Sequence, residues 1–217
     1  MQQQQRQQLT TRSVNLLAQT EEKCKAWQKQ QSISEALLAS LSNVLAQRSA
    51  AAENVEILER HSVDPERLAY KQTQAFERTL QQLSRVLENM SDIAAQLQKL
   101  EQDAAKHLQK AATLQSSSSN YKNPPALSSE SLIQVAAIPP DQVHDYVSSI
   151  SYMYTQELRY KQTWISLLPR YTASSDQMDE LQRYWQAQPH IDKAVEQDMS
   201  ERLKLYKQVK KTVESKD

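Results

Sequence analysis

The chain has 217 residues, and its 26 basic residues balance 26 acidic ones, so no net charge draws it toward nucleic acid or anionic lipid. It contains no glycine, which excludes the glycine-rich loops of P-loop, dinucleotide-binding and nucleophile-elbow enzymes. Cys24 is the single cysteine, which excludes an internal disulfide and a cysteine zinc cluster and fits a reducing compartment. No apolar run approaches the roughly 20 residues of a membrane span, so we expect a soluble intracellular protein.

The N-terminal half predicts two long helices. Residues 1–11 are rich in glutamine, offer little to bury, and are expected to be disordered. Apolar residues then recur at helical spacing over 12–60, from Leu16 to Leu45. Asp64 followed by Pro65 is typical of an N-cap with proline at the first helical position. A second helix is therefore predicted over 65–114, and 12–114 is predicted to be a coiled-coil hairpin.

The second of these helices carries the clearest pattern in the sequence, a seam in which apolar residues alternate steps of three and four, with Glu101 as the one charged interruption. Its members are Phe76, Leu80, Leu83, Leu87, Met90, Ala94, Leu97, Ala104, Leu108 and Ala111. Such a seam requires a partner helix. The first helix of the same chain is the favoured partner, since the connection is short, and pairing between two copies is the alternative.

Residues 115–141 are predicted to be a linker rich in serine and proline. A long irregular segment of this kind is often functional. Ile133 lies in its apolar run, 132–138, and is a candidate contact with a partner.

The remaining residues, 142–217, are predicted to form a smaller C-terminal helical bundle, which makes the whole protein all-α. A third helix is expected to run to Pro169, a fourth to begin with Asp176 as its cap, and a last one to carry Val195 to Val213. These helices are expected to pack on the hairpin, because 140–217 alone is near the lower limit for an independent core.

Eight of the thirteen aromatic residues fall between positions 140 and 190, and we predict that the main partner-binding surface lies there. Some of these rings share helical spacing with apolar neighbours and are expected to be partly core, whereas Tyr152, Glu157, Tyr160 and Lys161 are expected to lie off the core. The predicted partner-binding residues are Tyr152, Tyr154, Glu157, Tyr160, Lys161, Trp164, Trp185, Pro189 and Ile133.

Catalytic, cofactor-binding and metal-binding sites are not predicted. The four histidines, His61, His107, His144 and His190, show no metal-ligand spacing and are expected at the surface or its boundary. Glu157 and Lys161, four residues apart, are expected to form an ordinary helical ion pair. The basic tail from Arg202 to Lys211 is interpreted as a solvated helix face. We therefore expect a protein that is not an enzyme and needs no cofactor.

The run 152–161, followed by 184–189, resembles the cyclin-dependent kinase 2-interacting protein family. The matching features are Met-Tyr, Glu-Leu and Lys in one helix, then Trp with Gln-Pro. The N-terminal extension and the linker differ from the family's. The resemblance implies a non-catalytic nuclear adaptor associated with a cyclin-dependent kinase, with replication and checkpoint factors, and with a complex linked to ribosome biogenesis. That complex contains two AAA ATPases and a second small helical adaptor.

These partners imply a hetero-oligomer rather than a homodimer, without membrane association or direct binding of nucleic acid. The alternative from composition is a coiled-coil subunit of a kinetochore or vesicle-tethering complex. A more remote alternative is a nucleic-acid binder that uses the basic tail.

Overall fold

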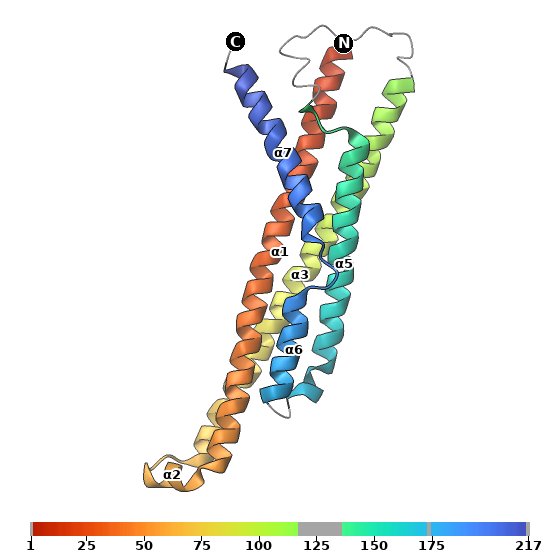
Figure 1. Ribbon diagram of the computed structural model, residues 1–217. Coiled ribbons are helices and arrows are strands. Elements are labelled where there is room, and N and C mark those ends of the chain that lie inside the picture. The colour runs from red at the N-terminus through yellow and green to blue at the C-terminus, as the bar shows by residue number, and fades with distance from the viewer. Residues whose placement is uncertain (1, 117–135, 173–174, 216–217) are drawn as a thin grey trace. The chain divides into compact units, whose positions relative to one another are not determined.

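A computed structural model describes residues 2–116, 136–172 and 175–215 of the chain (Figure 1). The described residues form helices without any strand, so the predicted all-α class is confirmed. The helices are α1 (Gln2–Glu53), α2 (Val55–Arg60), α3 (Pro65–Ser116), α5 (Pro140–Tyr171), α6 (Ser175–Ala187) and α7 (Lys193–Glu214). Ile133 lies outside the described residues.

Helices α1 and α3 pack closely and run antiparallel, as Figure 1 shows. The side-chain hydrogen bonds that join them include Ser13 with His107 (3.0 Å), Asn89 with Gln30 (3.3 Å) and Arg48 with Thr73 (2.8 Å). Residue numbers rise along α1 as they fall along α3, which defines the antiparallel direction. The predicted hairpin is therefore confirmed, with α3 paired to a helix of its own chain.

The connection between α1 and α3 contains the short helix α2 and ends at the predicted cap. Asp64 Oδ1 accepts hydrogen bonds from the backbone N–H of Glu66 (2.9 Å) and of Arg67 (3.3 Å). Pro65 occupies the first helical position, where its missing N–H costs nothing. Ser62, just after α2, has a φ of 54°, so the glycine-free chain uses serine in a left-handed turn.

The chain forms two compact units, each of which joins part of the hairpin to part of the C-terminal helices. Unit 1 comprises Met1–Lys25, Ile93–Thr155 and Ile191–Asp217, and unit 2 comprises Ala26–Asp92 and Gln156–His190. Helices α1, α3 and α5 each contribute residues to both units.

Unit 2 has a continuous hydrophobic core made by four helices. Its buried members are Leu38, Leu41 and Leu45 of α1, Leu83 of α3, Leu168 of α5, and Met178, Leu181 and Trp185 of α6. Phe76, Leu80 and Leu87 of the predicted seam pack against this core and are partly buried. The three tryptophans of the chain, Trp27, Trp164 and Trp185, all lie in unit 2.

Unit 1 buries apolar residues of α1, α3, α5 and α7. They include Leu16 and Leu17, Leu97 and Ala104, Val143, Val147 and Ile150, and Met199 and Leu203. Cys24, the only cysteine, is also buried in unit 1.

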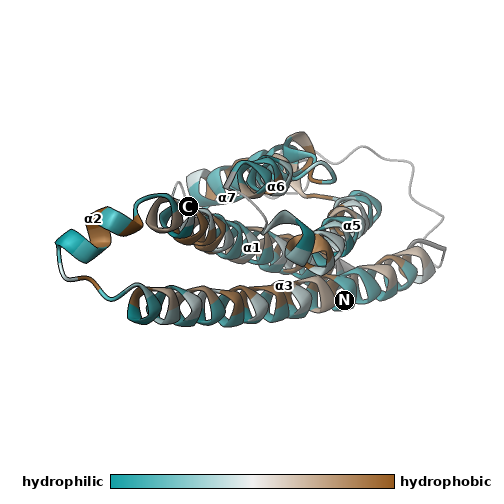
Figure 2. Ribbon diagram, turned by 90° about the horizontal axis from the view of Figure 1, so that it is seen from below, coloured by the Kyte–Doolittle hydropathy of each residue, from teal (hydrophilic) through white to brown (hydrophobic). Residues whose placement is uncertain are grey.

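Along α3, hydrophobic positions alternate with hydrophilic ones, as Figure 2 shows. A helix of this kind gains its stability chiefly from burying its apolar side.

Three helix boundaries differ from the expectations. Helix α1 already begins at Gln2, because glutamine is a good helix former and the run contains no breaker. Helix α5 continues past Pro169 to Tyr171. Proline has no backbone N–H, and at this position near the helix end that absence removes only one helical hydrogen bond. Helix α6 begins at Ser175, so Asp176 lies in its first turn rather than at the cap. A carboxylate in the first turn interacts favourably with the helix dipole.

Candidate protein-interaction site

Five aromatic rings of unit 2 contact one another on α5, α6 and the turn after α6, and we call them the aromatic cluster. The indole of Trp164 stacks on Tyr184, with centroids 4.9 Å apart and planes 11° apart. Tyr171 meets Trp164 edge-on at 5.6 Å, and Tyr160 meets it edge-on at 5.9 Å. Tyr160 also contacts the ring of His190 at 5.6 Å.

The aromatic cluster lies partly in solvent. Tyr184 keeps 43% of its surface exposed, His190 is exposed, and the other three rings are half-buried. Tyr160 and Trp164 are four residues apart on α5, and therefore lie on one side of that helix. Rings held rigidly by their neighbours bury much area on binding at little cost in conformational entropy, and Tyr and Trp are enriched among interface hot spots. The cluster therefore has the properties of a protein-binding surface.

Lys161 and Glu157 form a charged pair inside unit 2, and both side chains are 0% exposed. Lys161 Nζ lies 3.1 Å from Glu157 Oε1 and donates a hydrogen bond to the Trp185 carbonyl at 3.0 Å. Burial lowers the pKa of Lys161, while the carboxylates of Glu157 and Glu35 oppose that shift. Burying two charges is costly, so the pair is held only while both partners are present.

Trp185 connects this charged pair to α1. Its indole N–H donates to Ser34 Oγ at 2.8 Å, and its carbonyl accepts a second hydrogen bond from Gln31 Nε2 at 3.2 Å. The Lys161 ammonium lies 4.3 Å from the centroid of the Trp185 ring, within the range of a cation–π interaction. Trp185 is therefore fixed at its ring and at its backbone, one residue from Tyr184.

The turn after α6 is fixed by Gln188 and His190. Gln188 has a φ of 42°, a left-handed conformation that glycine usually provides at a helix C-terminus. Its side chain accepts a hydrogen bond from the indole N–H of Trp27 at 3.2 Å. The His190 backbone N–H donates to Glu157 Oε2 at 3.2 Å. These bonds hold the His190 ring where it contacts Tyr160.

The structure separates the predicted partner-binding residues into exposed and buried sets. Tyr152 is 66% exposed, Pro189 is exposed, and Tyr160 and Trp164 are half-buried. Tyr154, Glu157, Lys161 and Trp185 are buried. The expectation that Glu157 and Lys161 lie off the core is wrong, because each neutralises the other inside unit 2. The ion pair predicted from their spacing of four residues does form, but it is fully buried and is therefore not an ordinary helical ion pair. Whether any of these residues contacts a partner stays a prediction.

Sequence reasoning did not include Tyr171, Tyr184 and His190 among the site residues. Tyr184 could have been found only by knowing that α6 packs beside α5, since spacing within one helix does not show contacts between helices. The expected surface position is also wrong for His107, which is buried and hydrogen-bonded to Ser13.

In unit 1, Tyr154 donates a hydrogen bond to Glu196 Oε1 at 2.7 Å, and Tyr146 donates to Asp198. Burial, with the nearby Glu196 carboxylate, raises the pKa of the Cys24 thiol to about 12. A thiol of this kind is unreactive at neutral pH. Unit 1 thus uses neutral hydroxyl donors where unit 2 uses a charged pair.

The fold and the site define an all-α protein built on an antiparallel helical hairpin, with a partly exposed aromatic surface. No cluster of metal-ligating side chains occurs in the described part of the chain. None of the described helices has a stretch long and apolar enough to cross a bilayer.

The chain belongs to the family of C1orf109-like ribosome biogenesis proteins, because the family model "Ribosome biogenesis protein C1orf109-like" matches residues 7–209. No curated protein matches the chain. The family match connects the chain to ribosome biogenesis, as the sequence resemblance implied. The finer resemblance to the cyclin-dependent kinase 2-interacting protein family stays a prediction.

Proposed function

We propose that this chain is a non-catalytic adaptor that assists ribosome biogenesis as a small subunit of an AAA ATPase assembly in the nucleus. Membership of the C1orf109-like family supports the part in ribosome biogenesis. The sequence resemblance supports the ATPase assembly, a second small helical adaptor as neighbour, and a link to DNA replication through a cyclin-dependent kinase.

The aromatic cluster is the observation that carries the adaptor role. Tyr184 is exposed and Tyr160 and Trp164 are half-buried, while the buried Trp185 next to Tyr184 is fixed by Lys161 and Ser34. Such an arrangement suits recognition of another protein better than chemistry on a small molecule. We assign this surface to a subunit of the ATPase assembly, so the chain functions as part of a hetero-oligomer.

Affinity purification of the tagged full chain, followed by mass spectrometry, tests this assignment. Tyr184→Ala removes an exposed ring of the aromatic cluster, and Tyr70→Ala is the matched control, because Tyr70 is 69% exposed and lies outside the cluster. We expect the wild type and Tyr70→Ala to recover the AAA ATPase subunits in equal amounts. Recovery with Tyr184→Ala should fall at least about fivefold, which corresponds to about 1 kcal/mol of binding energy. The melting temperature of both variants should stay close to that of the wild type.

Other outcomes would select another function. A set of coiled-coil proteins in place of the ATPases would support a kinetochore or vesicle-tethering subunit. Equal recovery of the ATPases with Tyr184→Ala would show that the aromatic cluster is not the binding surface, and Tyr152→Ala would then test the exposed Tyr152 of α5. Depletion of the protein should lower the yield of mature ribosomal subunits on a sucrose gradient, and an unchanged profile would contradict the part in ribosome biogenesis.

A further inference from the structure

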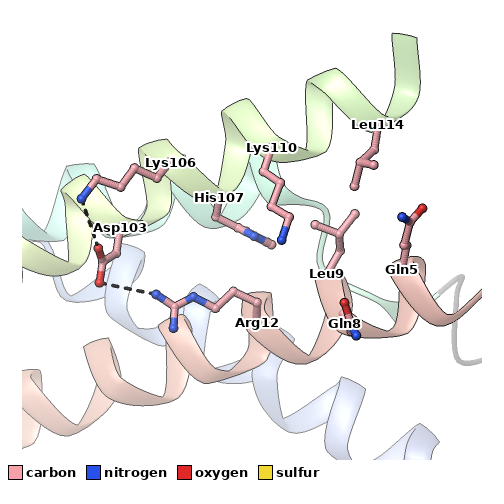
Figure 3. Close-up of a pocket in the computed structure, with 9 residues that line it drawn as sticks. All are labelled: Gln5, Gln8, Leu9, Arg12, Asp103, Lys106, His107, Lys110 and Leu114. Atoms are coloured by element: carbon pink, nitrogen blue, oxygen red, sulfur yellow. Dashed lines mark hydrogen bonds and ion pairs between the residues drawn. The ribbon is translucent and has the colours of Figure 1, made fainter. Parts of the chain in front are cut away.

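A pocket of about 390 Å³ lies in unit 1 between α1 and α3, as Figure 3 shows. This volume falls in the range of sites that bind small molecules or one or two side chains. Helix α1 contributes Gln5, Gln8, Leu9 and Arg12, and α3 contributes Asp103, Lys106, His107, Lys110 and Leu114.

Positive charge exceeds negative charge in this pocket. Arg12 lies 3.4 Å from Asp103, and Lys106 lies 3.8 Å from the same carboxylate. Lys110 has no described carboxylate within ion-pair distance, and in Figure 3 its side chain extends from α3 toward α1. Three cations and one anion therefore line the pocket, and a second anion would be attracted to the side on which Lys110 lies.

His107 forms the inner wall. It is buried, and its Nε2 lies 3.0 Å from Ser13 Oγ. Burial lowers the pKa of His107, and the positive charges of Arg12 and Lys110 lower it further. These two cations are thus close enough to act on the imidazole, which makes His107 a reporter of charge within the pocket.

The opposite end of the pocket is apolar. Leu9 and Leu114 approach each other there from α1 and α3, with Gln5 and Gln8 beside them (Figure 3). Both leucines are only partly buried, so the end can receive a further aliphatic group. The pocket therefore combines a cationic part with an adjacent apolar part.

We propose that this pocket binds an acidic peptide segment, with a carboxylate between Lys110 and Arg12 and a neighbouring aliphatic side chain against Leu9 and Leu114. Carboxylates form charge-assisted hydrogen bonds with both cations. An RNA phosphate would match the cations but not the leucines. RNA binding also depends on extended positive charge, whereas the whole chain has a net charge of zero. The pocket is independent of the aromatic cluster, so failure of this proposal would leave the adaptor role unaffected.

The test follows the His107 imidazole signals by NMR while the full chain is titrated with the blocked peptide acetyl-Leu-Glu-Glu-amide. We expect saturable shifts of His107 and an increase in its pKa, because a carboxylate offsets the charges of Arg12 and Lys110. Lys110→Gln and Arg12→Gln should each weaken binding at least about fivefold. Lys99→Gln is the matched control on an exposed position of α3 outside the pocket, and it should leave binding unchanged.

Two further ligands separate the sources of the anion. Inorganic phosphate tests the cationic part alone and should bind more weakly than the peptide, and a short single-stranded RNA should not shift His107 saturably. The acidic-peptide assignment is overturned if the peptide does not move His107, if phosphate binds as tightly as the peptide, or if RNA is the preferred ligand. It is also overturned if Lys110→Gln binds the peptide as the wild type does.

Discussion

The two units stabilise their buried polar groups by different chemistry. In unit 2, Lys161 and Glu157 are charged groups without solvent contact, and Lys161 also donates a hydrogen bond to the Trp185 carbonyl. In unit 1, the neutral hydroxyl of Tyr154 donates a hydrogen bond to Glu196, a residue that remains partly exposed. A fully buried charge depends on its partner far more than a partly solvated one. The difference predicts that unit 2 tolerates few single substitutions at its polar core and that unit 1 tolerates more.

The aromatic cluster lies in unit 2, the unit that contains the buried charged pair. Trp185 joins the charged pair to α1, and its neighbour Tyr184 stacks on Trp164. A core that is intolerant of rearrangement keeps exposed rings in one geometry, which lowers the entropic cost of binding a partner. The buried pair therefore positions the surface residues without contacting a partner itself.

The largest effect is expected from Leu83→Asp, at the centre of the unit 2 core. Leu83 is 1% exposed, so the substitution removes a packed side chain and introduces a buried charge. We expect a loss of about 5 kcal/mol of unfolding free energy. Urea denaturation followed by circular dichroism measures it. Unchanged helicity and stability would contradict the assigned seam.

A loss of about 3–5 kcal/mol is expected from Lys161→Met, because it leaves the Glu157 carboxylate buried and unpaired. The double variant Lys161→Met, Glu157→Gln removes both charges and should recover much of that loss. Urea denaturation of the two variants gives the free energies. A double variant no more stable than Lys161→Met would show that packing, not charge, decides the effect.

Tyr154→Phe is the corresponding test in unit 1 and should cost only about 1 kcal/mol. It removes one hydroxyl donor, and Glu196 can still be solvated. Thermal and urea denaturation of Tyr154→Phe and Lys161→Met under the same conditions compare their losses of unfolding free energy directly. Equal losses in the two variants would refute the proposed difference between the units.

The smallest expected effects are two pH dependences of opposite sign. Burial raises the pKa of Glu196 above 4.5, so the folded state holds more protons than the unfolded state between 4.5 and the raised pKa, and stability falls as pH rises there. Burial lowers the pKa of Lys161 below 10.5, so the folded state holds fewer protons in that window, and stability rises with pH up to about 10.5.

Urea midpoints between pH 4.5 and 7 should therefore depend less on pH in Glu196→Gln than in the wild type, with exposed Glu201→Gln as the control. Between pH 8 and 10.5, Lys161→Met should remove the upward slope. Slopes identical to the wild type in both variants would show that neither group contributes to the pH dependence.

The local features of the fold could be predicted from the sequence, and the contacts between distant segments could not. The 3–4 spacing around Leu83 and the Asp64–Pro65 pair are signals within a few residues, and both correspond to observed structure. The burial of Lys161 depends on Trp185, whose own partner Ser34 is 151 residues away in the sequence. Helical periodicity assigns a lysine to solvent unless its long-range partners are known.

The candidate site shows the same limit. Tyr160 and Trp164 could be selected because aromatic residues gather in that segment, but Tyr184 joins them only through the packing of α6 beside α5. The left-handed turn at Gln188 gave no signal either, since glycine, the usual indicator, is absent from the chain. The structure supplies these contacts, and with them the shape of the surface.

Because of where tryptophan and cysteine lie in the chain, the unfolding of each unit can be followed separately without introducing a probe by mutation. Indole fluorescence reports unit 2 alone, because Trp27, Trp164 and Trp185 all belong to it, and the accessibility of the Cys24 thiol to a disulfide reagent reports unit 1 alone. With a pKa of about 12, that thiol reacts at pH 8 only when its surroundings open. Coincident midpoints of the two signals in urea would define one cooperative transition, whereas separate midpoints would resolve two subglobal openings in the unmodified protein.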